Sequence, residues 1–236
     1  MFCAQKRRAF TLIEMLAVMS IVGILVAIIT PMVGKAIDNA RKMRASRNLH
    51  QIAAAYASFA LKGKARELNS CHSAAEWAGV MSKHDELNSA SLFILSDDYL
   101  VEADKRHIPK TIGIGGDGNW EINPEFASFP LSVVVITGVS VRAPASTTPI
   151  AYTRGLDNNS GTWRDAVGND GGIYGKSGGF IAFLDGHVEF YPNLTSEENM
   201  LINYKTGRKT PKISEAVNYG ARALSWTGAE WEVARK

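Results

Sequence analysis

The chain has 236 residues, of which 46% are hydrophobic and 21% charged, and this composition excludes a generally disordered protein. The formal net charge is +3, but three of the 26 basic residues (Lys6, Arg7 and Arg8) precede a long apolar run, which leaves 23 against 23 acidic residues. A neutral body gives no electrostatic reason to expect a nucleic-acid partner. Two cysteines exclude a disulfide framework, and the five histidines lack zinc-ligand spacing.

The first predicted element is a membrane-spanning helix. Residues 15–34 are 20 consecutive uncharged residues, and a helix of that length is about 30 Å long, the thickness of a bilayer's hydrocarbon core. The run is longer than a secretory h-region and no small-residue cleavage site closes it, so an ordinary signal peptide is disfavoured. A buried core helix is the alternative. Basic residues flank both ends, so charge alone does not decide the orientation.

One glutamate, Glu14, stands at the start of this run. A carboxylate in a membrane helix is costly unless it has a partner, so Glu14 is a candidate functional residue. The alternative is a side chain that only reaches the water interface, because Glu14 lies near the end of the apolar segment.

The stretch KRRAFTLIEMLAVMSIVGILVAIITP resembles the N-termini of type IV prepilins and of type II secretion pseudopilins. The resemblance implies a basic leader over residues 1–9 and cleavage between Ala9 and Phe10. Phe10 then becomes the N-methylated first residue, and Glu14 is the family's glutamate. Pro31 stands where many pilins have a proline that loosens the helix. Ala9 departs from the pattern, because glycine usually precedes the cut.

This resemblance implies a structural subunit rather than an enzyme, with no required cofactor. The preferred interpretation is a type II secretion pseudopilin, assembled into a periplasmic pseudopilus that drives protein export. The implied partners are copies of itself or other pseudopilins, the prepilin peptidase that also methylates, the inner-membrane assembly platform and the lipid bilayer. The chain would cross the bacterial inner membrane once, with a cytoplasmic N-terminus and a periplasmic head. The alternatives are a minor type IV pilin with an adhesive role and a membrane-tethered periplasmic enzyme.

The helix is predicted to continue beyond the membrane. Residues 10–34 form the transmembrane and assembly part, residues 35–64 an amphipathic continuation, and residues 65–236 a globular head. An apolar stripe at helical spacing runs along the continuation and predicts the face on which the head packs. Its members are Leu49, Ile52, Ala53, Tyr56, Phe59 and Ala60. Gly63 is the predicted stop.

The head reads as α+β: a long N-terminal helix packed on a small antiparallel sheet, as in pilins. Ser73 and Glu76 have capping-box spacing and predict a helix over 74–83. Residues 89–100 fit a helix or an extended segment. The β-branched stretches 131–141 and 148–154 predict strands.

The strongest local signal in the head is the alternating stretch FIAFLDGHVEFY, which predicts a β-hairpin over residues 180–191. Asp185-Gly186 suits a type I′ turn. Residues 195–204 and 213–220 read as short capped helices. The DGHV stretch also resembles a signature of bacterial prepilin-like proteins, although Gly175 replaces the histidine that often precedes it.

The segment 155–179 is rich in Gly, Asn and Asp, which suits turns or oxygen ligands for calcium. Resemblance to major pseudopilins, which commonly hold calcium in a C-terminal loop, makes Asp157, Asn159, Asp165 and Asp170 the candidate ligands. Their spacing does not reproduce an EF-hand loop, and a plain turn-rich loop is the preferred interpretation.

Evidence for the tethered enzyme is thin, since no G-x-S-x-G, H-E-x-x-H or P-loop motif occurs. Asp185 and His187 could be imagined as an acid–base pair, but the hairpin turn explains them better. Cys71 and His72 are adjacent in sequence only, which does not make a catalytic dyad. An adhesive role would be favoured if four tryptophans clustered on the surface, namely Trp120, Trp163, Trp226 and Trp231.

Overall fold

The computed structural model describes residues 11–115 and 119–234 of the chain. The chain divides into two compact units, Met1–Met43 and Arg44–Lys236. Helix α1 spans Leu12–Leu61 and contributes residues to both units.

In the first unit, α1 exposes its apolar side chains all round, from Leu12 to Val33. Its hydroxyl groups bond back to the preceding helical turn: Ser20 Oγ donates to the Leu16 carbonyl (2.8 Å) and Thr30 Oγ1 to the Val26 carbonyl (2.7 Å). These bonds satisfy polar groups that hydrocarbon could not. Among the described residues, α1 is the one helix long and apolar enough to cross a membrane.

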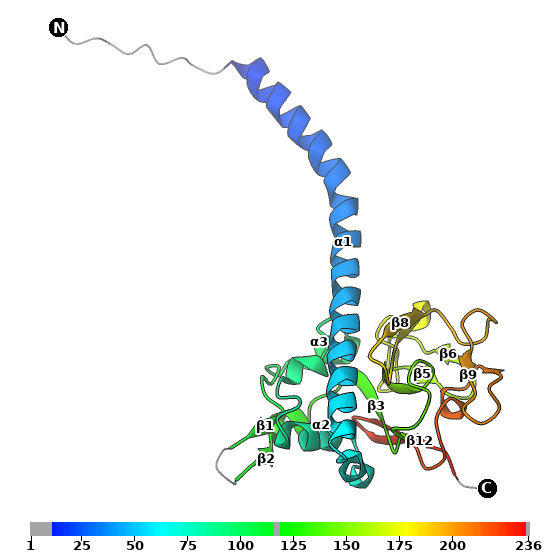
Figure 1. Cartoon of the computed structure of the whole chain (residues 1–236). Coiled ribbons are helices and arrows are strands. Elements are labelled where there is room, and N and C mark those ends of the chain that lie inside the picture. Colours follow the sequence, from blue (N-terminus) through cyan, green and yellow to red (C-terminus); the bar gives the residue numbers. More distant parts are fainter. Residues whose placement is uncertain (1–10, 116–118, 235–236) are drawn as a thin grey trace. The chain divides into compact units, whose positions relative to one another are not determined.

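In the second unit, the end of α1 lies within the head (Figure 1). The predicted stripe faces the core there, since Leu49, Ile52, Ala53, Tyr56 and Phe59 are all buried. The Tyr56 hydroxyl donates to the Val139 carbonyl at 3.1 Å, which satisfies its polar end inside the core. The helix ends at Leu61, and Gly63 adopts φ +76°, the left-handed conformation of a helix stop. The predicted stripe and stop are confirmed.

The centre of the head is a six-stranded antiparallel sheet with strand order β12-β11-β3-β4-β7-β8. Its strands are β3 Val133–Thr137, β4 Pro149–Thr153, β7 Gly179–Phe183, β8 Val188–Tyr191, β11 Arg222–Ser225 and β12 Gly228–Glu232. Every residue of β3, β4 and β7 is buried, so both faces of the central sheet are covered. The α+β fold and both predicted strands are confirmed.

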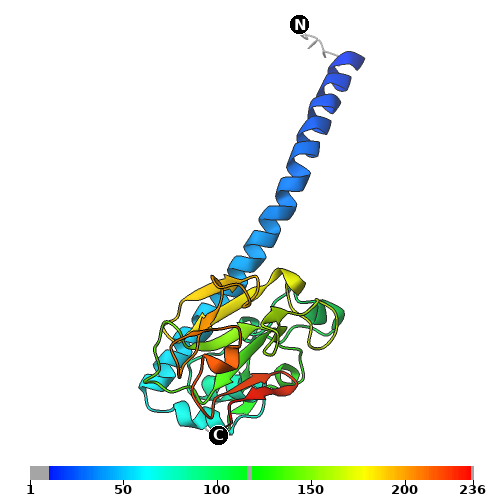
Figure 2. The same ribbon diagram turned by 90° about the vertical axis from the view of Figure 1, so that its right-hand side faces the viewer.

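Short elements complete the head. Before the sheet come η1 Ala65–Ser70, α2 Ala74–Lys83, η2 Ala90–Leu92, α3 Tyr99–Ala103, β1 Gly113–Ile114, β2 Glu121–Ile122 and α4 Pro124–Ala127. Between and after its strands come β5 Leu156–Asp157, β6 Thr162–Trp163, η3 Gly175–Ser177, β9 Leu201–Ile202, β10 Lys209–Thr210 and η4 Ile213–Glu215. Figure 2 looks onto the later of these segments, coloured yellow to red.

Helix α2 begins where its capping box predicts. Ser73 Oγ accepts the backbone N–H of Glu76 (3.2 Å), while the Glu76 carboxylate accepts the N–H of His72 (2.7 Å). The glutamate thus satisfies the residue before the cap rather than the cap itself, a small variation on the usual reciprocal pattern.

The hairpin β7–β8 is confirmed, but the expected type I′ turn is wrong. The Gly186 N–H donates to the Phe183 carbonyl (2.9 Å) and the Phe183 N–H to the His187 carbonyl (3.0 Å), which makes a three-residue loop. Gly186 has φ +93°, and Asp85 is the one non-glycine residue with positive φ in the part of the chain that the structure describes. Asp185 therefore keeps negative φ, as in a type I turn followed by a glycine bulge.

The structure does not contain the two short helices that the sequence predicts near the C-terminus. Residues 195–204 form turns and then strand β9, which pairs with β10. Pairing with a distant strand overrides the local helical preference there. Residues 213–220 make only the single 3₁₀ turn η4, and residues 89–100 contain η2 and the start of α3 rather than one helix or strand.

Candidate assembly site

Helix α1 starts with a reciprocal cap formed by Thr11 and Glu14. Glu14 Oε2 accepts both the backbone N–H and the hydroxyl of Thr11, each at 2.8 Å, and Thr11 Oγ1 accepts the N–H of Glu14 at 3.3 Å. These are the bonds of a capping box, which satisfies N–H groups that a helix start leaves free. The T-x-x-E spacing of Thr11 and Glu14 is the sequence signal that predicts this cap. The interpretation of Glu14 as an isolated charge in the membrane missed that signal.

The cap uses one of the two oxygens of the Glu14 carboxylate. Both bonds from Thr11 end on the same oxygen, Oε2. Thr11 directly follows Phe10, so the carboxylate lies beside the first described residue after the predicted cut. Ala9 and Phe10 lie outside the described residues, and their cleavage and methylation stay predictions.

The predicted loosening at Pro31 also stays a prediction. Helix α1 continues through this position to Leu61 in the single chain. Beyond the apolar run, Arg41 lies 3.9 Å from Asp38 in an exposed ion pair one helical turn apart, an arrangement that contributes little stability.

In the head, the aspartates predicted as calcium ligands form hydrogen bonds and ion pairs with protein groups. Asp157 accepts the Asn159 N–H (3.0 Å) and the Ser160 hydroxyl (3.0 Å). The Asn159 N–H, more than any other group, lowers the pKa of Asp157. The structure therefore uses this carboxylate to close a tight turn, as aspartates commonly do.

The remaining candidates face cationic side chains. Arg164 lies 3.8 Å from Asp157 and 3.7 Å from Asp170, while Lys176 lies 3.0 Å from Asp165. Within residues 11–115 and 119–234, no group of three or more His, Cys, Asp or Glu side chains could hold a metal ion. This arrangement does not fit a calcium donor set, which needs six to eight oxygen atoms around one point.

The two conceivable catalytic pairs are explained by structure. His187 Nδ1 lies 2.5 Å from Asp185 Oδ1, and its ring stacks on Phe183 at 4.2 Å between centroids. The pair lies at the hairpin turn, where the Asp185 carboxylate also accepts the His187 N–H. The contact between Asp185 and His187 therefore stabilises the hairpin turn.

Cys71 and His72 do not form a nucleophile and base. The Cys71 side chain is buried, and burial raises the pKa of its thiol to about 11. His72 is exposed and its Nδ1 lies 3.5 Å from the Glu76 carboxylate. A thiol with so high a pKa is almost entirely protonated at neutral pH and is a poor nucleophile.

The four tryptophans do not form an exposed patch. Trp163 is buried against Gly179, and Trp226 and Trp231 pack on the core. Trp231 Nε1 donates to the Tyr152 hydroxyl at 3.1 Å. Trp120 is half-buried over Gly113. The surface cluster that would favour an adhesive role is missing.

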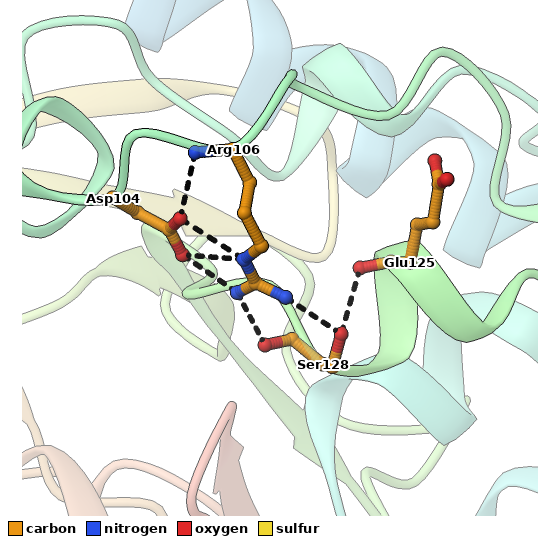
Figure 3. A network of polar contacts seen from close by, with 4 residues as sticks. All are labelled: Asp104, Arg106, Glu125 and Ser128. Carbon is orange, nitrogen blue, oxygen red and sulfur yellow. Dashed lines mark hydrogen bonds and ion pairs between the residues drawn. The ribbon is translucent and has the colours of Figure 1, made fainter.

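A surface network around Arg106 connects the segment after α3 to the end of α4 (Figure 3). The guanidinium donates to the Asp104 carboxylate through Nε (3.0 Å) and Nη2 (2.6 Å). It also donates to the hydroxyl and the carbonyl of Ser128. A cavity of about 490 Å³ lies beside it. Because the guanidinium bonds to both Asp104 and Ser128, Arg106 connects the segment after α3 to the end of α4.

The comparisons with known proteins point to the start of the chain. Residues 4–30 match the model of the prokaryotic N-terminal methylation motif. No curated protein and no solved structure matches the chain. The matched residues cover the predicted cut, Glu14 and most of the apolar run, and leave the head without a comparison. They support a type IV prepilin-like protein.

Proposed function

We propose that this chain, type IV prepilin-like at its N-terminus, is a structural subunit of a filament assembled through helix α1. The preferred form is a type II secretion pseudopilin. It would be anchored in the inner membrane with its head in the periplasm until the assembly platform extracts it. A minor type IV pilin is the second candidate.

One observation carries this proposal: the methylation motif coincides with a helix whose apolar side chains are exposed all round. The motif covers residues 4–30, and α1 exposes large apolar side chains from Leu12 to Val33. Exposing so large an apolar surface to water is unfavourable, so lipid or other helices must cover it. Both environments suit a subunit that moves from a membrane into a filament.

The cap at Glu14 supports a specific assembly contact. Cleavage before Phe10 creates an ammonium group next to Thr11, whose N–H already bonds to Glu14 Oε2. A charge within a membrane is costly without a partner. Pairing the ammonium of one subunit with Glu14 of its neighbour lowers the cost of both charges, because the second carboxylate oxygen can accept a charge-assisted bond. Side-by-side assembly is thereby favoured.

The choice of pseudopilin over adhesive pilin rests on the head. Cys71 is reduced and buried, so no disulfide closes a C-terminal region among the described residues. Of the four tryptophans considered for an adhesive surface, Trp163 is buried, Trp226 and Trp231 pack on the core, and Trp120 is half-buried. Both features favour a pseudopilin over an adhesive pilin.

The decisive experiment is intact-mass spectrometry of the protein from native membranes. We expect a mass that starts at N-methylated Phe10, because the motif spans the predicted cut. A Phe10→Asp variant, in which the residue after the cut is acidic, is the matched control and should retain the leader. A wild-type mass that still includes residues 1–9 would contradict prepilin processing and favour a membrane-tethered protein of another kind.

A further inference from the structure

The segment between β4 and β7 folds back on itself in a close backbone contact. The Arg164 N–H donates to the Gly155 carbonyl (2.8 Å) and the Gly172 N–H to the Asp165 carbonyl (2.9 Å). At Gly155, which has φ +105°, a Cβ atom would lie 2.1 Å from the Gly172 Cα. The two ends of the loop are therefore packed closely together through their backbones.

The first group that binds oxygens of this loop is Arg154, which directly follows β4. Its side chain is buried, and Nη1 donates to the carbonyls of Asn169 and Gly171, each at 2.9 Å. Nη2 donates to Asp98 Oδ1 at 2.5 Å, which balances the buried charge. One guanidinium thus holds two backbone oxygens of the loop and is anchored to the body of the head.

The second group is Arg164, at the outer side of the same loop. Its guanidinium lies between two carboxylates, 3.8 Å from Asp157 and 3.7 Å from Asp170. Half of its side chain is exposed, so solvent weakens each pair. Lys176 adds a third cationic contact at Asp165.

We propose that Arg154 and Arg164 order this loop in place of a calcium ion, so that the head folds independently of calcium. Calcium binds carboxylate and carbonyl oxygens, and here two carbonyls and two carboxylates of that kind face guanidinium groups. A divalent ion entering the loop would meet the positive charge of Arg164 at close range. Arginine stays charged at every physiological pH, and its planar fork fits such oxygens well.

The inference separates this chain from the calcium-binding pseudopilins that its N-terminus resembles. A calcium-dependent head is ordered only where the ion is present. A head ordered by its own arginines is ready for assembly whatever the calcium concentration outside the inner membrane.

The test is thermal unfolding of the full-length protein in detergent, with calcium chloride or with excess EGTA. We expect the same midpoint in both, within about 1 °C. A bound ion at a hundred times its Kd would raise the midpoint of a head this size by about 5–10 °C. A midpoint that rises with calcium and falls with EGTA would overturn the proposal.

A variant tests the arginine directly. Arg164→Gln removes the charge from a half-exposed position, so the protein should still fold, whereas an Arg154 variant leaves Asp98 buried without its partner. We expect faster hydrogen exchange in residues 165–172 of Arg164→Gln than in the wild type. Arg208→Gln, at an exposed arginine outside the loop, should leave that segment unchanged.

Unchanged exchange in Arg164→Gln would show that the guanidinium does not order the loop, and would refute its proposed role. This outcome is independent of the mass measurement, because processing at Phe10 does not involve the loop. Failure of one proposal is therefore distinguishable from failure of the other.

Discussion

Asp98 and Arg154, 56 residues apart, form an ion pair 2.5 Å long with both side chains almost fully excluded from solvent. Asp98 also accepts the Leu100 N–H (3.0 Å) and the Ser132 hydroxyl (2.7 Å). The carboxylate therefore caps α3, binds the start of the central sheet and fixes the arginine that holds the loop 165–172. Its hydrogen bonds offset the cost of burying the charge.

Removing one partner of this pair should destabilise the head strongly. Asp98→Ala leaves the Arg154 guanidinium buried without a counter-charge, and we expect a loss of about 3–5 kcal/mol in the free energy of unfolding. Urea unfolding followed by tryptophan fluorescence measures the loss. Asp104→Ala, which breaks the surface pair with Arg106, is the matched control and should cost far less. If both variants lost the same free energy of unfolding, burial would not be the reason that the Asp98–Arg154 pair stabilises the head.

Glu14 should matter for assembly through its charge, and a pair of substitutions separates charge from capping. Glu14→Gln keeps an oxygen that accepts the Thr11 N–H, but it cannot form an ion pair with a neighbour's ammonium. We expect both Glu14→Gln and Glu14→Ala to reduce the assembled fraction about tenfold or more, because a charge-assisted hydrogen bond contributes about 1.5–3 kcal/mol. Sedimentation of sheared filaments measures it.

The control for this experiment is Thr11→Val, which removes the hydroxyl of the cap and keeps the carboxylate. It should assemble nearly as well as the wild type. Normal filaments from Glu14→Gln would mean that the helix cap, rather than the ion pair, is what assembly requires of this glutamate.

The turn at Asp157 should make the loop sensitive to acid. The Asn159 N–H, followed by the Ser160 hydroxyl and Arg164, lowers the pKa of Asp157 below its ordinary value. A carboxyl whose pKa is lowered by folding stabilises the folded state above its unfolded pKa of about 3.9, and this contribution is lost as the pH falls through the folded pKa. Stability should therefore fall below about pH 4. Asp157→Asn should show a shallower fall over that range, and an identical pH profile would exclude a contribution from this group.

Much of this fold follows from local sequence patterns. The apolar stripe of α1, the Ser73 cap of α2 and the alternation on either side of Asp185-Gly186 each depend on residues within a few positions of one another. Local physics is enough for such elements. The cap at Thr11 belongs to this group as well, since its partner Glu14 lies three residues away.

The remainder depends on contacts that no local pattern encodes. Strand β9 forms because β10 pairs with it, although residues 195–204 have helical preferences. The roles of Arg154 and Arg164 follow from loop closure, which brings Asn169, Gly171 and Asp170 to them. The aspartates of segment 155–179 attract notice in the sequence as possible metal ligands, but their partners become visible only in three dimensions.

Cys71 gives the processed protein a built-in chemical reporter. Cleavage before Phe10 would remove Cys3 and leave Cys71 as the sole thiol of the chain. Its pKa of about 11 and its burial between η1 and α2 keep it nearly inert to alkylating reagents in the closed head. The alkylation rate of the native protein then measures how often this part of the head opens. Cysteines introduced on the exposed face of α1 can be cross-linked between subunits with almost no background from the head.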